Sequence, residues 1–429
     1  MLDMKNLKLF NPNKSLASTL MALSILVLSN VSMSLAQNVG ALSLPGVSQT
    51  QHKPLVVLIS IDGYRNDYMS RGLTPTLKRL ADSGAYAENF MPVFPSITFP
   101  NHYSLVTGLY PDHHGLVNNT MQDPSKTKQI FKLSDRESVT NPIWYEEATP
   151  IWISAKQQGK IVSTLFWPGT EVINHGLRPD DWLNYDDNMA SDKRVDQLLE
   201  WLNRDESKRA DFATLYFSEV DHAGHEFGPD ASEVNESLKR VDIAIDRFVK
   251  GLERLNLLKD VTFVITSDHG MAHVTQEHVI NLSTVLENTK SAKLVWMGPV
   301  AGFNVDRVDA EPMLERLKTY PHMSCWHKSK IPPEYHFGTH RRIPDIFCLA
   351  DVGWSILPNS SMKVIAGMHG YDARAKEMQG LFIAAGPGVK KQTLPVVHNI
   401  DVYAFLAHLL KIKPEPNDGE DSLFKQIMN

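Results

Sequence analysis

The stretch LVVLISIDGY, residues 55–64, joins a nearly continuous apolar run, Leu55–Ile61, to an acidic residue, Asp62. An apolar run without alternation predicts a strand that is buried on both faces, as in a parallel sheet. Two further β-rich runs end close to acidic residues, before Asp221 in ATLYFSEVDHAGHEFGP and before Asp268 in VTFVITSDHGM. Open α/β sheets bind their ligands at the carboxyl ends of such strands, so we expect these three carboxylates to meet at one edge.

Three histidines accompany these carboxylates and complete a set of metal-ligand types. His225 and His269 lie in the same motifs, and His369 follows the shorter apolar run Lys363–Met368 in VIAGMHGYD. Zinc accepts carboxylate and imidazole ligands, and three of each are enough for two divalent ions. A hydroxyl group, Thr98 in FPSITFPNH, lies between the first and second motifs. Two metals stabilise both the attacking and the leaving oxygen of a displacement at phosphorus, so the pattern predicts a metallo-hydrolase of phosphate esters.

Each of these signals taken alone has an ordinary structural explanation. A D-H-G triplet is common turn chemistry. An Asp after a strand is often a helix N-cap, and a lone Thr is usually structural. The prediction of a metal site therefore depends on the coincidence of several such motifs after apolar runs.

Strand-like and helix-like segments alternate along the chain, which favours an α/β fold with a central, mostly parallel sheet flanked by helices. The expected strands are Leu55–Ile61, Lys160–Trp167, Val261–Thr266 and Leu381–Ala385. The expected helices are Pro75–Ser83, Asn101–Thr107, Asp192–Asn203, Ala231–Asn256, Leu314–Thr319 and Val402–Leu410. The segment Pro168–Tyr185 is rich in Gly, Pro, Asp and Asn and is expected as an insertion.

The N-terminal segment 1–36 has the pattern of a secretory signal peptide. Three lysines, the last of them Lys14, precede an apolar run over Leu16–Val31, and small residues over Ser34–Ala36 form a cleavage site. An uncleaved membrane anchor is the alternative, although the run is short for a span. We expect a signal peptide over 1–36, a polar spacer over 37–52 and a single catalytic domain over 53–429. The protein would be secreted or periplasmic, with no transmembrane span after cleavage.

Net charge and cysteine content bear on the binding partners and on a disulfide. The formal net charge of −6 argues against a general nucleic-acid-binding surface, and a phosphate-bearing substrate would need metal ions or local cations to offset that sign. The two cysteines, Cys325 and Cys348, are expected to form a disulfide in an oxidising compartment, with two buried thiols as the alternative. The sequence leaves the oligomeric state open.

Six motifs, taken in order, resemble the nucleotide pyrophosphatase/phosphodiesterase family of the alkaline phosphatase superfamily, in a minimal bacterial form. They are ISIDGYRNDY, MPVFPSITFPNHYSLVTGLYPDHHGLVNN, TLFWPGTEV, EVDHAGHEFGP, TSDHGM and GMHGYDARAKEMQGLFIAAGPG. The resemblance implies an alkaline phosphatase-like fold and two zinc ions per chain. One ion would be held by Asp62, Thr98, Asp268 and His269, and the other by Asp221, His225 and His369.

The resemblance also implies roles around the phosphate. Thr98 would be the nucleophile, and Asn119 together with the Thr98 backbone N–H would hydrogen-bond a non-bridging phosphate oxygen. Phe99 and Tyr185 match positions that sandwich a nucleotide base. The implied activity is zinc-dependent hydrolysis of pyrophosphate and phosphodiester bonds in nucleoside triphosphates and dinucleotides. It would release nucleoside 5'-monophosphates through a phospho-threonine intermediate.

Two features refine the expected substrate. No Arg follows Thr98 closely, and a bidentate Arg would suit a dianionic monoester, so a diester or pyrophosphate is favoured unless an Arg distant in sequence folds into the site. The insertion Pro168–Tyr185 matches a segment that the family's lysophospholipase D member lacks, which favours nucleotides. The main alternative is a phosphodiesterase for lipid head groups such as glycerophosphocholine or lysophospholipids. In that case Trp167, Trp182 and Tyr185 would supply a choline cage.

Three other classes fit the motifs less well. A sulfatase would carry Cys or Ser at the position of Thr98. A phosphoglycerate mutase-like enzyme would place Ser there and act in the cytosol, which conflicts with a signal peptide. A binding protein without catalytic activity would not need the complete set of metal-ligand types.

Overall fold

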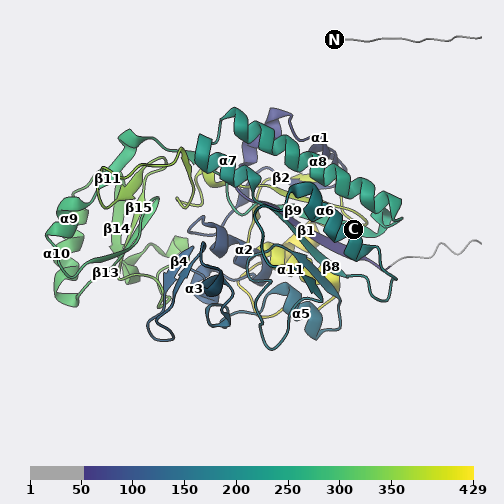
Figure 1. Ribbon diagram of the computed structural model, residues 1–429, viewed down its shortest axis with the longest axis horizontal. Coiled ribbons are helices and arrows are strands. Elements are labelled where there is room, and N and C mark those ends of the chain that lie inside the picture. Colours follow the sequence, from purple (N-terminus) through teal and green to yellow (C-terminus); the bar gives the residue numbers. More distant parts are fainter. Residues whose placement is uncertain (1–52) are drawn as a thin grey trace, which may run out of the picture. The chain divides into compact units, whose positions relative to one another are not determined.

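A central sheet organises residues 53–429, the part of the chain that the computed structural model describes (Figure 1). Its strands lie in the order β19-β2-β18-β9-β1-β8-β6-β7. They are β1 (Leu55–Ile61), β2 (Ala85–Ala87), β6 (Val162–Leu165), β7 (Asp181–Trp182), β8 (Phe212–Phe217), β9 (Val261–Thr266), β18 (Phe382–Ala385) and β19 (Gln392–Leu394). Strand β18 is antiparallel to both of its neighbours, and the other pairs are parallel, so the predicted mostly parallel α/β sheet is confirmed.

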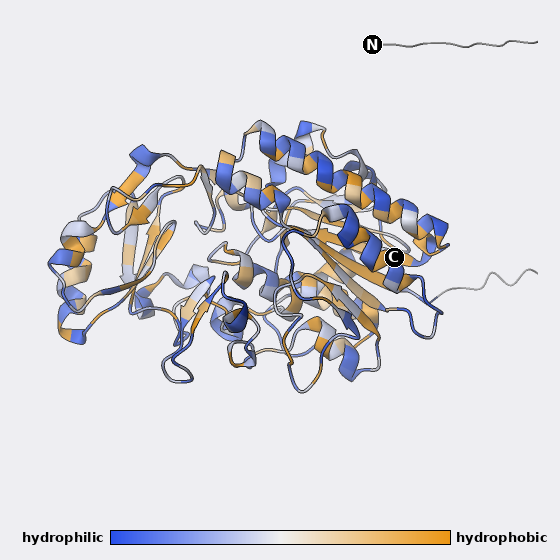
Figure 2. Cartoon of the chain, in the orientation of Figure 1, coloured by the Kyte–Doolittle hydropathy of each residue, from blue (hydrophilic) through white to orange (hydrophobic). Residues whose placement is uncertain are grey.

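Strand β1 lies in the middle of this sheet because its side chains are apolar on both faces. It pairs in parallel with β8 on one side and with β9 on the other. Leu55, Val57 and Ile59 belong to one buried cluster, and Val56 and Leu58 belong to a second cluster on the opposite face. The strands of the sheet are largely orange in Figure 2, and the long helix α8 is mostly blue on its outer surface.

Helices cover both faces of the sheet and supply the rest of the two clusters. One face is covered by α1 (Pro75–Ser83), α6 (Ser191–Leu202), α7 (Glu219–Phe227) and α8 (Ser232–Arg254). The other is covered by α2 (Thr98–Thr107), α5 (Ile151–Gln157) and α11 (Asp401–Leu410). The prediction for α1 is confirmed at both ends. Helix α2 begins at Thr98 and not at the predicted Asn101.

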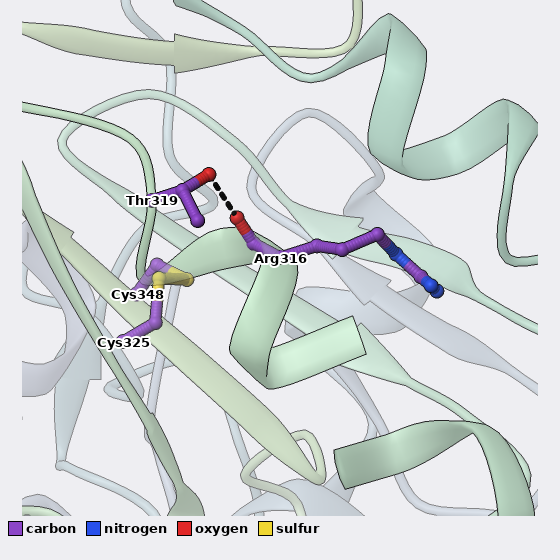
Figure 3. The surroundings of a disulfide bond; sticks show 4 residues. All are labelled: Arg316, Thr319, Cys325 and Cys348. Carbon is purple, nitrogen blue, oxygen red and sulfur yellow. Dashed lines mark hydrogen bonds between the residues drawn. A yellow bond between two sulfur atoms is a disulfide. The ribbon is translucent and has the colours of Figure 1, made fainter. Parts of the chain in front are cut away.

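A smaller antiparallel sheet carries the disulfide. Its strands, in spatial order, are β12 (Lys293–Trp296), β13 (Val300–Asn304), β15 (Ile346–Ala350) and β14 (Met323–His327), with α9 (Ser283–Glu287) and α10 (Arg307–Leu317) beside them. Cys325 and Cys348 are register partners on β14 and β15, with Cα atoms 4.1 Å apart, and the predicted disulfide is confirmed. Figure 3 shows it near the end of α10, where the Thr319 hydroxyl donates to the Arg316 carbonyl at 2.7 Å.

The prediction for α10 placed this helix too late, over Leu314–Thr319. The observed helix starts at Arg307 and contains Pro312, a residue that usually ends a helix. Packing of Met313, Leu314 and Leu317 in the core of the smaller sheet outweighs this local preference.

Short elements complete the described chain. The short strands form the pairs β3 (Phe90–Met91) with β20 (Val397–His398), β4 (Thr120–Gln122) with β5 (Ile130–Lys132), β10 (Ala272–His273) with β17 (Gly367–Met368), and β11 (Val279–Asn281) with β16 (Ser355–Leu357). The short helices are α3 (Pro111–His114), α4 (Arg136–Val139) and α12 (Ser422–Ile427). Turns of 3-10 helix cover Asn66–Arg71, Pro142–Trp144, Leu258–Asp260, Gln276–His278, Lys328–Lys330, Pro333–Tyr335 and Lys376–Met378.

The segment predicted as an insertion, Pro168–Tyr185, supplies β7, which pairs with β6 at the edge of the central sheet. The predicted signal peptide, 1–36, lies outside the described residues. Over 53–429, none of the helices combines the length and the apolar character that a membrane span requires.

Candidate active site

Three carboxylates lie close together beyond the carboxyl ends of adjacent central strands. Asp62 directly follows β1, and Asp268 follows the parallel strand β9 after a single residue. The backbone N–H of Gly63 donates to Asp268 Oδ1 at 3.2 Å, which ties the two strand ends together. Asp221 comes from the segment after β8, the other neighbour of β1. The sheet therefore brings together the three acids that the sequence pattern singled out.

Asp221 and His225 lie on a helix. The sequence pattern predicted positions in or next to a loop after the apolar run, but α7 begins at Glu219, almost directly after β8. Residues four apart share one face of a helix, so both side chains point the same way. His225 Nε2 lies 3.4 Å from Asp221 Oδ2.

The three histidines of the site share one orientation. Each ring turns Nδ1 to a backbone carbonyl and Nε2 toward the carboxylates. For His225, His369 and His269 the carbonyls are those of Gly367, Ser96 and Gly270, at 2.8, 2.9 and 2.9 Å. A carbonyl only accepts, so Nδ1 carries a proton in each ring, and Nε2 of a neutral ring presents a lone pair. Metal-binding histidines are commonly oriented in this way.

Asp221, His225 and His369 form a group that fits a divalent cation. The Nε2 atoms of His225 and His369 lie only 3.2 Å apart, and Asp221 Oδ1 is 3.6 Å from His369 Nε2. Burial, together with His269 and His225, holds the pKa of His369 well below its usual range, so this ring is neutral. Asp221 Oδ1 is buried without a hydrogen-bond partner. Converging lone pairs and an unpaired buried oxygen are the donor set that a metal ion satisfies.

Asp62, Asp268 and His269 form a second group, and Thr98 borders it. His269 Nε2 lies 2.9 Å from Asp268 Oδ2, 3.6 Å from Asp62 Oδ1 and 3.3 Å from Thr98 Oγ1. The rings of His269 and His369 stack with centroids 3.5 Å apart, so the two groups adjoin. Asp62 Oδ1 and Asp268 Oδ2 are buried without hydrogen-bond partners, which again fits a cation.

Burial and like charge shape the protonation of this second group. Burial, then the neighbouring Asp268 and Asp221, raise the pKa of Asp62 well above its usual range. Burial acts in the same direction on Asp268, but His269 and His102 outweigh it and hold the pKa of Asp268 low. Burial opposes the charge of His269, and Asp268 still raises its pKa. Protons and a divalent cation compete for such ligands, so metal binding here would release protons.

Thr98 is the first residue of α2, and the loop before it is held in place by Asn101. The Asn101 amide accepts from Val93 N–H at 2.8 Å and donates to the carbonyls of Val93, Pro95 and Ile97. The first N–H groups of a helix have no intrahelical acceptor and attract anions. The Thr98 hydroxyl therefore lies where an anionic phosphate would be stabilised.

Asn119 lies beside the start of this helix. Its Oδ1 accepts from the Phe99 backbone N–H at 2.9 Å. Since that hydrogen bond uses the amide oxygen, the NH2 group of Asn119 is left to donate to a ligand. The structure thus places Asn119 at the first turn of α2, in contact with Phe99, the residue that follows Thr98.

One pocket of about 210 Å³ opens onto Thr98, Asp62 and Asp221. Phe99 and Tyr185 both line it, together with Leu133, Val139, Phe166, Trp167 and Tyr216. Of the three aromatics suggested for a choline cage, Trp182 is not among the lining residues. It packs instead against the guanidinium of Arg178, 4.8 Å from the ring centre.

An arginine distant in sequence, Arg136 on α4, also lines this pocket. Its guanidinium forms a bidentate ion pair with Glu171 of the segment 168–185, with one contact at 2.9 Å. Glu171 Oε1 also accepts from the Tyr185 backbone N–H at 3.0 Å. An Arg distant in sequence thus reaches the pocket, and in this structure it is paired with a carboxylate.

Two residues of this region were missed by the sequence interpretation. Tyr216 lies within β8, and its hydroxyl donates to Asp62 Oδ2 at 2.6 Å. His102 lies on α2, fully buried, with Nδ1 3.3 Å from Asp268 Oδ2. An aromatic ring in a buried strand looks like core packing, so no signal marked Tyr216. The spacing of four residues from Thr98 to His102, which puts both on one face of a helix, was a signal that the late predicted start of α2 concealed.

Sequence comparison connects most of the chain to a known protein family. The model of the type I phosphodiesterase/nucleotide pyrophosphatase family matches residues 56–372. An uncharacterized pyrophosphatase/phosphodiesterase of Schizosaccharomyces pombe is 37% identical over 385 residues, which cover 85% of this chain and 78% of that protein. The bis(5'-adenosyl)-triphosphatase enpp4 of Xenopus laevis is 36% identical over 378 residues, which cover 87% of this chain and 82% of that protein. Family member 1 of the ectonucleotide pyrophosphatase/phosphodiesterases of Homo sapiens is 36% identical over 392 residues, but only 42% of that protein is covered.

Solved structures give the same result. Human ectonucleotide pyrophosphatase/phosphodiesterase 5 superposes with a TM-score of 0.83 at 31% identity, over 87% of this chain and 100% of that one. An inactive threonine-to-alanine variant of the murine protein, in complex with AMP, has the same TM-score of 0.83 and identity of 31%.

Fold and site together define an enzyme that hydrolyses phosphodiester and diphosphate bonds. The chain belongs to the type I phosphodiesterase/nucleotide pyrophosphatase family. The resemblance and the alkaline phosphatase-like fold stated from the sequence are confirmed.

Proposed function

We propose that this enzyme hydrolyses nucleotides through a covalent intermediate on Thr98, with two zinc ions as cofactors. The observation that carries the proposal is the position of the Thr98 hydroxyl. It lies at the start of α2, 3.3 Å from His269 Nε2 and at the wall of the pocket that contains Phe99 and Tyr185. A Thr hydroxyl is a weak nucleophile until a base or a metal activates it.

The donor groups on either side of the stacked histidines support two ions. Asp62, Asp268 and His269, with the Thr98 hydroxyl, would hold one ion. Asp221, His225 and His369 would hold the other. Carboxylate and imidazole together suit zinc. Bound there, the ions would supply charge stabilisation for the attacking and leaving oxygens and lower the pKa of a bound water.

The residues of the chain would divide the reaction into two displacements. In the first, Thr98 Oγ1 bonds to the phosphorus, the bond to the leaving group breaks, and the nucleotide's phosphate becomes esterified to Thr98. In the second, water attacks that ester, frees the nucleoside 5'-monophosphate and restores the hydroxyl. Two in-line steps predict net retention at phosphorus. The Asn119 NH2 group and the Thr98 backbone N–H would donate to a non-bridging oxygen in both steps.

The pocket and the relatives support nucleotides as substrates. Phe99 and Tyr185 offer aromatic faces, and stacking tolerates every base. The murine relative was solved with AMP, and the amphibian relative is named a bis(5'-adenosyl)-triphosphatase. Nucleoside triphosphates and dinucleotides are therefore the proposed substrates, and secretion through a signal peptide would place the enzyme outside the cytoplasm.

The direct test compares Thr98→Ala with wild type on p-nitrophenyl thymidine monophosphate. We expect a loss of at least about a thousandfold in kcat. Thr107→Ala is the matched control, because Thr107 ends the same helix and is buried, and its hydroxyl contacts only backbone groups of the helix end: it donates to the Tyr103 carbonyl at 2.7 Å and accepts from the Leu109 N–H at 3.4 Å. Acid quenching during turnover should trap nucleotide on the peptide that contains Thr98. Activity of Thr98→Ala within tenfold of wild type would rule Thr98 out.

A further inference from the structure

The proposed reaction assigns no part to His102, although this residue contacts the site. It is fully buried on α2, one helical turn after Thr98. Its Nδ1 lies 3.0 Å from the Thr98 carbonyl and 3.3 Å from Asp268 Oδ2, and its Nε2 lies 2.8 Å from Ser60 Oγ. One imidazole thus touches the backbone of the proposed nucleophile, a carboxylate of the adjoining metal-ligand group and the strand β1.

The partners of His102 fix its tautomer. The Thr98 carbonyl only accepts, so Nδ1 carries the proton and donates it there, with the Asp268 carboxylate in ion-pair contact 3.3 Å from the same atom. Nε2 then accepts from the Ser60 hydroxyl. Both ring nitrogens are occupied, so His102 has no lone pair for a metal, although it lies within reach of Asp62 and Asp268.

The ring of His102 is also held on its sides. Trp167 and Tyr216 pack edge-on against it, with centroids 5.1 and 5.3 Å away. The indole N–H of Trp167 donates to the His102 carbonyl at 3.0 Å. The imidazole is therefore held at its edges, with Nδ1 facing both Asp268 and the first turn of α2.

We propose that His102 is a positioning residue of this enzyme. Its single Nδ1–H contacts both Asp268 and the Thr98 backbone, and so holds the Thr98 hydroxyl at a fixed position relative to the Asp268 carboxylate. The proposal rests on the proposed function of Thr98. Outer hydrogen bonds of this kind typically change activity or metal affinity by about 10- to 100-fold. Because Phe99 and Tyr185 would hold the substrate, loss of the coupling should act on kcat and leave KM nearly unchanged.

Two substitutions of similar size separate positioning from simple packing. In His102→Asn, the side-chain NH2 can take the place of Nδ1–H and still donate. In His102→Gln, the amide reaches the Nε2 position next to Ser60, and the donor to Asp268 is lost. We expect His102→Gln to lower kcat by about 10- to 100-fold with KM within about threefold, and His102→Asn to restore most of that loss. Elemental analysis after dialysis against a limiting chelator needs no turnover. It should show that His102→Asn retains more metal than His102→Gln.

His114, the last residue of the short helix α3, provides a matched control. It is also fully buried, and its Nε2 lies 2.9 Å from the hydroxyl of Ser104 on α2, away from the carboxylates. His114→Gln should lower the unfolding midpoint without a selective loss of kcat. Equal losses for His102→Asn and His102→Gln, or a His102→Gln enzyme with wild-type kcat and metal retention, would overturn the proposal. If His102→Gln does not fold, His102→Asn decides alone, since a hundredfold loss of kcat in that variant contradicts positioning through Nδ1. An inactive wild type would instead refute the proposed function, while the metal-retention order would still test the coupling.

Discussion

Tyr185 offers the sharpest test of how the pocket selects its substrate. Its ring lines the pocket, half-buried, and packs edge-on against Phe166 and Tyr216 with centroids 5.3 and 6.1 Å away. Its hydroxyl donates to Asp187 Oδ1 at 2.6 Å. Tyr185→Ala removes both the aromatic face and this hydrogen bond, whereas Tyr185→Phe removes the hydrogen bond alone.

The expected magnitude follows from the stacking energy. Loss of one base–aromatic stack costs about 1–3 kcal/mol, which is about 5- to 150-fold in KM for a nucleotide diester. A small substrate without a base, bis-p-nitrophenyl phosphate, should lose much less. Tyr185→Phe should bind nucleotides almost as wild type does, because the ring keeps its contacts with Phe166. Tyr185 is preferred over Phe99 because Phe99 is almost fully buried against Phe131, at 5.3 Å between centroids, so its removal would disturb the core.

The assay is steady-state kinetics of the three proteins on p-nitrophenyl thymidine monophosphate and bis-p-nitrophenyl phosphate, with the unfolding midpoint of each variant as a check. Equal losses on both substrates would show that Tyr185 supports the fold and does not contact the base. A Tyr185→Phe enzyme as impaired as Tyr185→Ala would assign the effect to the hydrogen bond with Asp187.

Three further predictions test the metal site and the smaller sheet. Chelation should abolish activity and zinc should restore it. His369→Ala should lower the metal content, measured by elemental analysis, from about two ions per chain toward one. A fully active metal-free protein would contradict both expectations. Tyr216→Phe removes the 2.6 Å hydrogen bond to Asp62 and should lower metal retention or kcat by about 10- to 100-fold, whereas no change in either would show that the contact is dispensable. Replacing Cys325 and Cys348 by Ala opens a loop with a sequence separation of 23. The chain-entropy relation then predicts a loss of about 3 kcal/mol in unfolding free energy by denaturant titration, with kcat retained; an unchanged denaturation midpoint would contradict the prediction.

The elements that the sequence predicted best end at residues with strong local preferences. Strand β1 was predicted correctly at both ends, and its carboxyl end is marked by Asp62 and Gly63, which interrupt the apolar run. Gly63 has a positive φ of 67°, and a side chain there would meet the Asp221 backbone at 2.9 Å, so glycine is required for the turn and for the close approach. Helix α1 begins with Pro75 and is followed by Gly84, the usual punctuation at either end.

The start of α2 could not be read from the sequence for a physical reason. Residue Ile97 precedes the helix and has no side chain that can cap it, and Pro100 lies in the first turn. The stabilising group is Asn101, which bonds backward to the loop over several residues. Such a contact exists only once the loop has folded, so local propensity favoured a later start and hid the position of Thr98 at the helix terminus.

The position of His369 beside the ligands on α7 depends on one glycine, Gly367, whose role cannot be read from the sequence. A side chain on Gly367 would come within 2.2 Å of the Gly224 carbonyl on α7, so the two backbones touch only because residue 367 is a glycine. At this contact Ala366 N–H donates to the His225 carbonyl at 3.0 Å, and His225 Nδ1 meets the Gly367 carbonyl at 2.8 Å. The chain then needs only two more residues to bring His369 Nε2 to 3.2 Å from His225 Nε2. Composition and periodicity could name the ligand types, but the distance between them is set by this backbone contact, which only the tertiary structure reveals.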